Sequence, residues 1–288
     1  MATATLARGS GRSRYAFLLA PKALFGLLMI GALIVAGAFA PLIAPFDPAR
    51  QDLMAAMTPP QLTGPHFLGT DHVGRDLLSR IIFGARVSLL IAIAVVVFSG
   101  IAGIVLGIVS GYFGSRIDSL IQKFLEVFWA FPPLLLAIAI VAFLGQGLAI
   151  VIIALASQRW IPYCRLARAE AMSLRDREFV VAARSLGAGH TRILREHILP
   201  NILPSMLVVG TFAMATAIIS EAALSFLGLG VPPTIPTWGG MLADARAYIS
   251  TSWWMALFPG LCIFLTVLGI NLLGDVLRTR FDPKIKNF

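Results

Sequence analysis

The sequence predicts an all-α, polytopic membrane protein with six transmembrane helices. Of its 288 residues, 58% are hydrophobic and 13% are charged, whereas soluble domains average about 45–50% apolar and about 25% charged residues. The apolar residues come in blocks of roughly 20, the length that crosses a bilayer at about 1.5 Å per residue. Because a backbone in lipid must satisfy its own hydrogen bonds, each block is expected to be a helix.

Low charge and the lack of a short Gly or Pro repeat exclude disordered and fibrous classes. A cleaved signal peptide has a shorter apolar core than the first block, so the length of this block favours a span. The fourth block is the weakest, because it is short and runs into Arg159. The predicted spans are residues 23–44, 88–112, 124–144, 147–163, 203–225 and 253–274.

The distribution of positive charge predicts the orientation. With the N-terminus in the cytoplasm, the extracytoplasmic segments hold five of the 23 Lys and Arg residues, and the other 18 lie inside. This asymmetry agrees with the positive-inside rule, so the net charge of +9 indicates membrane topology and no nucleic-acid partner. The five outer residues are Arg50, Arg75, Arg80, Arg86 and Arg246.

These predictions divide the chain into segments. A cytoplasmic N-terminal segment (1–22) and the first span (23–44) precede an extracytoplasmic loop with an amphipathic segment (45–87). A core of five helices (88–275) contains a cytoplasmic loop (164–200), and a cytoplasmic tail (276–288) follows. Both termini are therefore expected inside the cell, and lipid surrounds the spans.

No catalytic, cofactor or metal site is expected. Cys164 and Cys262 lie in or beside apolar segments and are interpreted as core residues. His66 and His72 could be grouped with Asp71 as metal ligands, but two histidines six residues apart share no helix face. The chain also has no phosphate-binding loop and no hydrolase motif.

The cytoplasmic loop contains a predicted helix over residues 177–186. Its apolar side chains recur at helical spacing, and Gly187 is suited to the left-handed residue that ends a helix. A second helical run, 191–199, follows, and Pro200 and Pro204 are predicted to make the turn into the fifth span. The loop is either a surface helix on lipid headgroups or a docking surface for a cytoplasmic partner. The predicted apolar face consists of Phe179, Val180, Ala183 and Leu186.

Glycines and prolines predict the packing of two spans. Gly103, Gly107 and Gly111 recur every four residues, which allows close helix contact within the chain or with a partner. Pro132 and Pro133 are expected to bend the third span.

Several motifs resemble those of bacterial ABC importer permeases, in particular the C-subunit type of the dipeptide/oligopeptide/nickel family. The run 181–200 resembles the EAA signature, although Val181 stands where Glu is usual and His197 where Ile is usual. The segment 68–80, Leu-Gly-Thr-Asp-His-Val-Gly-Arg-Asp-Leu-Leu-Ser-Arg, resembles a second family motif. Further matching segments are 83–86, 130–132, 221–230, 238–239, 271–275 and 281–283.

The resemblance implies a type I ABC importer permease in the cytoplasmic membrane. Its implied partners are ATPase subunits, a second and different permease, and an extracytoplasmic substrate-binding protein. The implied substrates are peptides; nickel chelates and glutathione-like compounds stay open, and an ion-coupled secondary transporter is the alternative from another class. The implied ATPase-coupling residues are Glu178, Phe179, Val180, Val181, Ala182, Ala183, Arg184, Leu186, Gly187, Ala188, Leu199 and Pro200.

A translocation path or outer gate is the last prediction. In residues 66–86, acidic and basic side chains nearly balance, which suits either an interfacial amphipathic helix with local ion pairs or part of a gate. Glu221, near the outer end of the fifth span, is either a buried hydrogen-bonding group or an acid that meets a peptide amine. The candidate path or gate residues are Asp71, Arg75, Asp76, Glu221 and Pro132.

Overall fold

The computed structural model describes residues 21–281, and they are predominantly helical. Predictions for residues 1–20 and 282–288, at the two ends of the chain, lie outside this range. The α-helices are α1 (Pro21–Ala38), α2 (Ala40–Ile43), α3 (Leu77–Phe113), α4 (Ser115–Trp129), α5 (Pro133–Leu144), α6 (Leu148–Arg175), α7 (Glu178–Ser185), α8 (His190–Arg192), α9 (Leu199–Phe226), α10 (Trp238–Ala245) and α11 (Trp254–Phe281). A π-helical segment, Ile193–Ile198, joins α8 to α9.

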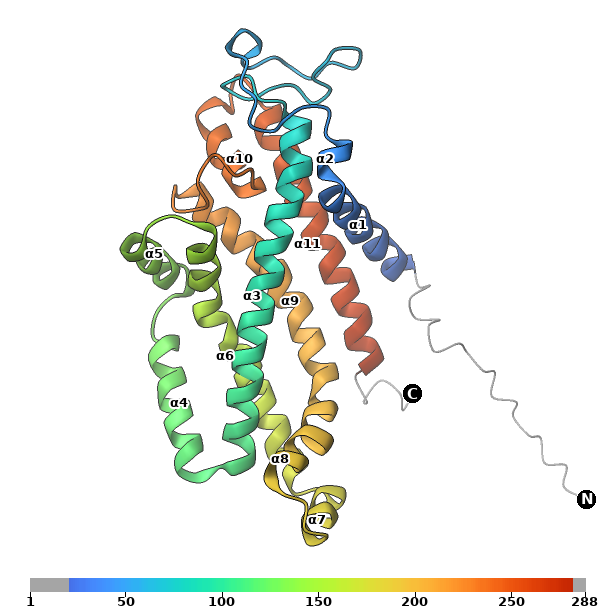
Figure 1. The fold of residues 1–288 in the computed structure, drawn as a ribbon, viewed down its shortest axis with the longest axis vertical. Coiled ribbons are helices and arrows are strands. Elements are labelled where there is room, and N and C mark those ends of the chain that lie inside the picture. Colours follow the sequence, from blue (N-terminus) through green and yellow to red (C-terminus); the bar gives the residue numbers. More distant parts are fainter. Residues whose placement is uncertain (1–20, 282–288) are drawn as a thin grey trace, which may run out of the picture.

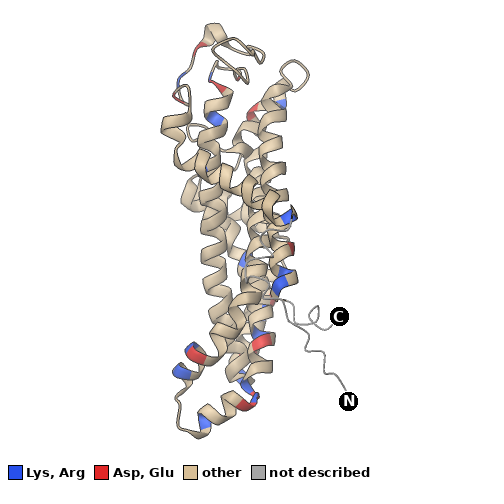
Figure 2. Ribbon diagram, turned by 90° about the vertical axis from the view of Figure 1, so that its right-hand side faces the viewer, with Lys and Arg blue, Asp and Glu red and all other residues tan. Residues whose placement is uncertain are grey.

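The longest helices run along the long axis of the molecule (Figure 1). α3, α6 and α9 pack together, α11 lies against α9, and α1 lies against α11. The 45–76 connection and α10 occupy one end, and α7 and α8 occupy the other (Figure 1). Figure 2 shows most acidic and basic residues toward the two ends and a few at mid-height. Ile91, Val151 and Ile218 belong to the buried core between α3, α6 and α9.

The all-α, multi-span class is confirmed, but the number of spans differs from the prediction. In the described part of the chain, four helices are long and apolar enough to cross a membrane: α1, α3, the continuous helix His190–Phe226 and α11. The bent pair α4 and α5 raises this to five. The predicted fourth span lies in α6, where Ser157, Gln158 and Arg159 interrupt the apolar run after its first turns.

The predicted bend in the third span is confirmed. α4 ends at Trp129, α5 begins at Pro133, and the two helices meet at 82°. Pro132 has extended backbone angles (φ −57°, ψ 133°), because the proline that follows it disfavours the helical conformation at this position. The predicted span is therefore two short helices rather than one kinked helix.

The predicted turn at Pro200 and Pro204 is wrong. Both prolines lie within α9, which continues the helical path of residues 190–198 without a break. The π-helical segment just before Pro200 already departs from the i→i−4 pattern, so a residue without an N–H costs little there. The side-chain amide of Asn201 donates to the carbonyl of His197 at 2.6 Å and satisfies an acceptor near this irregular turn.

The glycines at four-residue spacing in α3 pack against α6 of the same chain. A Cβ atom added to Gly103, Gly107 or Gly111 would lie 2.3–2.4 Å from a backbone carbonyl oxygen of α6. The oxygens belong to Trp160, Cys164 and Arg168, each one helical turn after the last. The two backbones therefore touch along three successive turns, and only glycine fits at these positions in α3.

We expect Gly107→Ala to lower the free energy of unfolding by about 1–3 kcal/mol, the usual range for an overpacked core. The added methyl group would overlap the Cys164 carbonyl oxygen, so α3 and α6 must move apart. The check is the thermal unfolding midpoint of the purified transporter in mild detergent. Gly100→Ala is the matched control, because its Cβ would lie 3.7 Å from the Tyr163 ring, an ordinary contact distance. Equal stability of the two variants would contradict the prediction.

Candidate functional site

The helix predicted in the cytoplasmic loop is α7, and it ends in a Schellman motif. Gly187 has a φ of +85°, a left-handed conformation that suits glycine. The N–H of Gly187 donates to the carbonyl of Arg184, and the N–H of Ala188 donates to that of Ala183, each at 3.0 Å. The prediction that Gly187 ends this helix is confirmed. These bonds fix the backbone that follows α7.

The apolar residues of α7 divide between two faces. Val180 is fully buried and packs in a cluster with Ile193 and Ile198. Phe179 and Leu186, which were predicted to share its face, are 44% and 89% exposed. Val181 is 46% exposed. One side chain thus anchors α7 to the chain, and the other large apolar side chains point outward.

The remaining predicted coupling residues are distributed around this anchor. Glu178, Ala182, Arg184 and Pro200 are exposed, and Leu199 is half-buried at the start of α9. The structure thus brings residues 178–188 together in one compact turn. Leu199 and Pro200 belong to the helix that leads from it.

Three contacts join residues in and around this turn to the end of α3. The Tyr112 hydroxyl lies 2.9 Å from Nδ1 of His190, and the guanidinium of Arg184 lies 5.8 Å from the centre of the Tyr112 ring. Arg175, at the end of α6, donates to the carbonyl of Gly111 at 3.2 Å. These contacts connect the residues around α7 with the ends of α3 and α6.

A half-buried ion pair, which the sequence did not predict, joins α4 to α6 nearby. The guanidinium of Arg168 donates through Nε and Nη2 to the two oxygens of Asp118, both at 2.6 Å. Ser110 of α3 also donates to Asp118. A bidentate arginine–carboxylate pair is among the strongest polar contacts, so α3, α4 and α6 are joined at this end.

At the opposite end, two glycines shape the motif that precedes α3. Gly69 and Gly74 have φ values of +81° and +79°. A Cβ atom on Gly74 would overlap the carbonyl oxygen of Asp52, and one on Gly69 would lie 2.6 Å from that of Thr58. These positions need glycine both for their conformation and for the close approach of the 45–60 chain.

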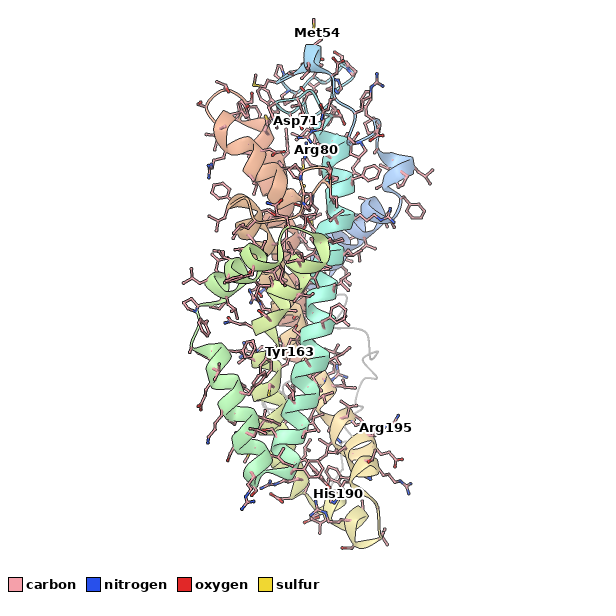
Figure 3. The ribbon with its side chains drawn as sticks, turned by 60° about the vertical axis from the view of Figure 1, so that its left-hand side comes forward. Met54, Asp71, Arg80, Tyr163, His190 and Arg195 are labelled. Atoms are coloured by element: carbon pink, nitrogen blue, oxygen red, sulfur yellow. The ribbon has the colours of Figure 1, made fainter. Side chains whose placement is uncertain are left out.

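Between these glycines, Asp71 is the centre of a buried charge cluster. Its carboxylate accepts from Nε of Arg75 at 2.6 Å and also from Nη1 of Arg80. Asp244, on α10, lies 3.2 Å from Nη2 of Arg75 and 3.4 Å from Nη2 of Arg80. Asp71, Arg75 and Arg80 are 2%, 8% and 3% exposed. Two arginines and two aspartates thus neutralise one another and tie α10 to α3. Figure 3 shows Asp71 and Arg80 close together at this end.

Asp76 caps α3 instead of joining this cluster. Its side chain accepts from the backbone N–H of Ser79 at 2.8 Å and from the Ser79 hydroxyl at 2.7 Å, as expected of an N-cap aspartate. Nδ1 of His66 lies 2.9 Å from its other oxygen. His66 therefore contacts a helix cap, and the described residues contain no group of three His, Cys, Asp or Glu that could hold a metal ion.

The charged side chains of residues 66–86 form ion pairs with nearby residues, as predicted for an interfacial amphipathic helix. The segment before α3, however, is not helical. Residues 66–76 form turns, and α3 begins only at Leu77. The left-handed glycine conformations and the hydrogen bonds of Asp71 fold the segment into a compact series of turns. A role of Asp71, Arg75 and Asp76 in a gate stays a prediction.

Glu221 lies in a buried contact between α9 and α10. It is 1% exposed and accepts a hydrogen bond from Ser225 at 2.8 Å. Its other oxygen faces Gly239, in the first turn of α10, where a Cβ atom would lie 3.0 Å away. These surroundings favour the interpretation of Glu221 as a buried hydrogen-bonding group. A position of Glu221 or Pro132 on a translocation path stays a prediction.

Two family descriptions match this sequence. Residues 103–287 match the binding-protein-dependent transport system inner membrane component family. The chain belongs to this family. Residues 14–60 match the N-terminal transmembrane domain of oligopeptide transport permease C.

Curated relatives match over most of the chain. The di/tripeptide transport system permease protein DppC of Pseudomonas aeruginosa is 48% identical over 269 residues, which cover 92% of this chain and 89% of the relative. The dipeptide permease DppC of Alkalihalophilus pseudofirmus is 43% identical, and the oligopeptide permease OppC of Bacillus subtilis is 38% identical; each match covers 92% of this chain and 86% of the relative.

A solved structure of the MetNI methionine ABC transporter, in an inward-facing conformation, has the same fold. The TM-score is 0.58 at 18% sequence identity, and the match covers 69% of this chain and 95% of the solved chain. The ABC importer permease fold is thereby confirmed. The chain is a multi-pass inner-membrane permease component and not a catalytic subunit. Membership in a binding-protein-dependent ABC system implies ATPase and binding-protein partners.

We expect Asp71→Asn to destabilise the protein by about 3–5 kcal/mol near neutral pH, because it leaves two buried arginines short of one counter-charge. Burial by itself raises the pKa of Asp71, but the charges of Arg80 and Arg75 and the backbone N–H of Arg75 outweigh it and hold the pKa below its ordinary value of 3.8. The ionised carboxylate therefore stabilises the fold above that value, and this stabilisation is lost as the pH falls through the lowered pKa.

The measurement is the unfolding midpoint of each variant between pH 7 and pH 3. The difference between wild type and Asp71→Asn is expected to be constant above about pH 5 and to shrink at the acidic end. Asp47→Asn, at an exposed aspartate in the same connection, is the control and is expected to change stability by less than about 0.5 kcal/mol. A difference that grows on acidification would contradict the assignment.

Proposed function

We propose that this chain is a permease subunit of an ATP-driven importer of di- or oligopeptides, and that residues 178–188 dock on an ATPase subunit. The observation that carries the substrate class is the identity of 38–48%, over more than nine-tenths of the chain, to permeases named for dipeptide, di/tripeptide and oligopeptide transport. None of these three relatives is named for transport of nickel chelates or glutathione-like compounds.

The shape and exposure of α7 support the docking role. Phe179, Val181 and Leu186 present large apolar side chains to the outside, at the tip of the molecule. Val180 and the Schellman motif after Ser185 hold the helix rigidly from behind. A short rigid helix with an exposed apolar surface and flanking arginines is suited to a groove on a protein partner. Val181 replaces the usual glutamate, so contact at this position is apolar.

The transmission of motion follows from the contacts behind α7. ATP-driven closure of the ATPases would displace the docked helix, and the contact of Tyr112 with His190 carries that displacement to α3. Because α3 and α6 are in backbone contact, they move as one body. Such rigid-body motion between two states is a common form of coupling, and ATP drives it through its different affinity for the two states.

Orientation and the second permease complete the proposal. The excess of Lys and Arg around residues 159–200 supports a cytoplasmic position for α7. The N- and C-termini are then both cytoplasmic, and the Asp71 cluster faces the binding protein. We propose that a different permease subunit forms the other half of the pore, as the resemblance to the dipeptide/oligopeptide/nickel family implies.

The function is tested by uptake of labelled dipeptide into proteoliposomes that contain this chain with its co-purifying ATPases and second permease, supplied with binding protein. Uptake is expected to require ATP inside the vesicle and to continue when ion gradients are collapsed. A nickel chelate and glutathione serve as competitors and are expected to leave dipeptide uptake unchanged. Uptake driven by an ion gradient without ATP would overturn the importer assignment.

We expect Leu186→Asp to lower ATP-dependent uptake at least tenfold and to reduce co-purification of the ATPase. A leucine that becomes buried on docking contributes about 1.5–3 kcal/mol, and an aspartate at the same place adds the cost of a buried charge. Met54→Asp, at a methionine that is 97% exposed at the opposite end of the molecule (Figure 3), is the matched control. Equal ATPase recovery from both variants would show that Leu186 does not dock.

A further inference from the structure

A cavity of about 500 Å³ lies beside α5, α6 and α9. Its lining is mostly apolar and includes Trp129, Leu134 and Ile219. Its charged or hydrogen-bonding side chains include Gln158, Arg159 and Ser220. Binding sites for small molecules commonly measure about 300–1,000 Å³ and combine an apolar wall with a few polar groups.

Arg159 hydrogen-bonds only to neutral groups. Nη1 donates to the Thr216 hydroxyl at 2.9 Å, and Nη2 donates to the Ser220 hydroxyl at 2.6 Å and to the Thr216 carbonyl at 3.4 Å. Both hydroxyls donate their own hydrogens to backbone carbonyls of α9, so their oxygens are oriented as acceptors. The guanidinium has five N–H donors, and these bonds fix its direction while leaving donors available.

Arg159 differs in this respect from three other arginines of the described chain that are at least half-buried. Arg75 and Arg80 form ion pairs with aspartates. Arg168, which lies on α6 with Arg159, also pairs with an aspartate. No Asp or Glu among residues 21–281 forms an ion pair with Arg159. The positive charge therefore has no counter-charge within the described chain.

The position of this charge is between the two polar ends. Sequence analysis placed Arg159 at the cytoplasmic edge of a span, but it contacts residues 216 and 220, inside the apolar stretch of α9. In Figure 3, Tyr163, one helical turn further along α6, lies about midway between Arg80 and His190. A charged side chain packed against an apolar stretch of another helix is costly and usually marks the path of a substrate or ion.

Gln158 supplies the complementary group. Its Nε2 donates to the carbonyl of Phe128 at 2.7 Å and to that of Phe131 at 3.0 Å. Both amide hydrogens are thereby used, because carbonyls can only accept, and Oε1 is left as an acceptor on a cavity-lining residue. The site thus offers a fixed cation and a nearby acceptor against an apolar wall.

We propose that Arg159 binds the C-terminal carboxylate of a peptide during its passage, with Gln158 accepting a peptide N–H and the apolar wall receiving a side chain. This inference rests on the proposed function, because it assumes that the substrate is a peptide. A guanidinium matches a carboxylate in charge and geometry, and the cavity volume suits a di- or tripeptide.

The test compares a dipeptide with its C-terminal amide in proteoliposomes of the complete transporter. Arg159→Gln is expected to lower uptake of the free acid about tenfold or more and uptake of the amide less than about twofold, because only the acid loses a charge-assisted hydrogen bond. Arg159→Lys is expected to keep part of the acid uptake, since it keeps the charge. The binding protein is the same in every assay, so its preference for the acid over the amide affects all variants equally.

Arg116→Gln is the control. Arg116 is exposed, lies on α4 and does not line the cavity. We expect this variant to retain the wild-type ratio of acid to amide uptake. Equal losses of acid and amide in Arg159→Gln, or unchanged uptake of both, would overturn the inference.

A second readout does not depend on uptake. Ile219 lines the cavity without bonding to Arg159, so a cysteine there, in a Cys262→Ala background, reports occupancy through its rate of reaction with a charged maleimide. Millimolar dipeptide is expected to slow the reaction in the presence of Arg159 and not in Arg159→Gln, and the amide is expected to have little effect. Equal protection in both backgrounds would overturn the inference.

The outcomes separate this inference from the proposed function. If Arg159→Gln prevents recovery of the second permease, Arg159 pairs with an acid of that subunit and the peptide role is wrong. If the wild type imports dipeptide with ATP but Arg159→Gln does so equally well, only this inference fails. If the wild type imports no peptide at all, the proposed function fails and this inference fails with it.

Discussion

The contact between α3 and α6 is the constraint on which the rest of the structure depends. Gly103, Gly107 and Gly111 bring the two backbones together over three turns, at distances that no side chain on α3 would permit. In a membrane the hydrophobic effect does not drive helices together, so close van der Waals contact of this kind carries much of the association. α9 packs on both of these helices, and α11 packs on α9.

This pair of helices connects two polar regions at opposite ends of the molecule. At one end, Asp71 and Asp244 neutralise two arginines and fix α10 to the start of α3. At the other, Tyr112 contacts His190 beside α7. Both regions are therefore attached to the same pair of closely packed helices. This arrangement suits a permease that changes state by rigid-body movement.

Few charged side chains lie between these ends, and Arg159 on α6 is one of them. The interruption of the apolar run by Ser157, Gln158 and Arg159 is the feature that keeps α6 from qualifying as a span by composition. The same residues line a cavity or lie next to it. A departure from the pattern expected of a transmembrane helix thus coincides with the place where the structure offers a binding site, as local inconsistencies at functional sites often do.

Sequence alone determined what local physics controls. The helical class, the break at Pro132–Pro133 and the end of α7 at Gly187 all follow from side chains and backbones within a few residues. The tertiary structure decided the long-range pairings, such as Arg75 with Asp244 across 169 residues, and which side of α7 is exposed. It also decided that Arg159 has no acidic partner in the described chain. These depend on how helices far apart in sequence pack together, and a local pattern contains no information about that packing.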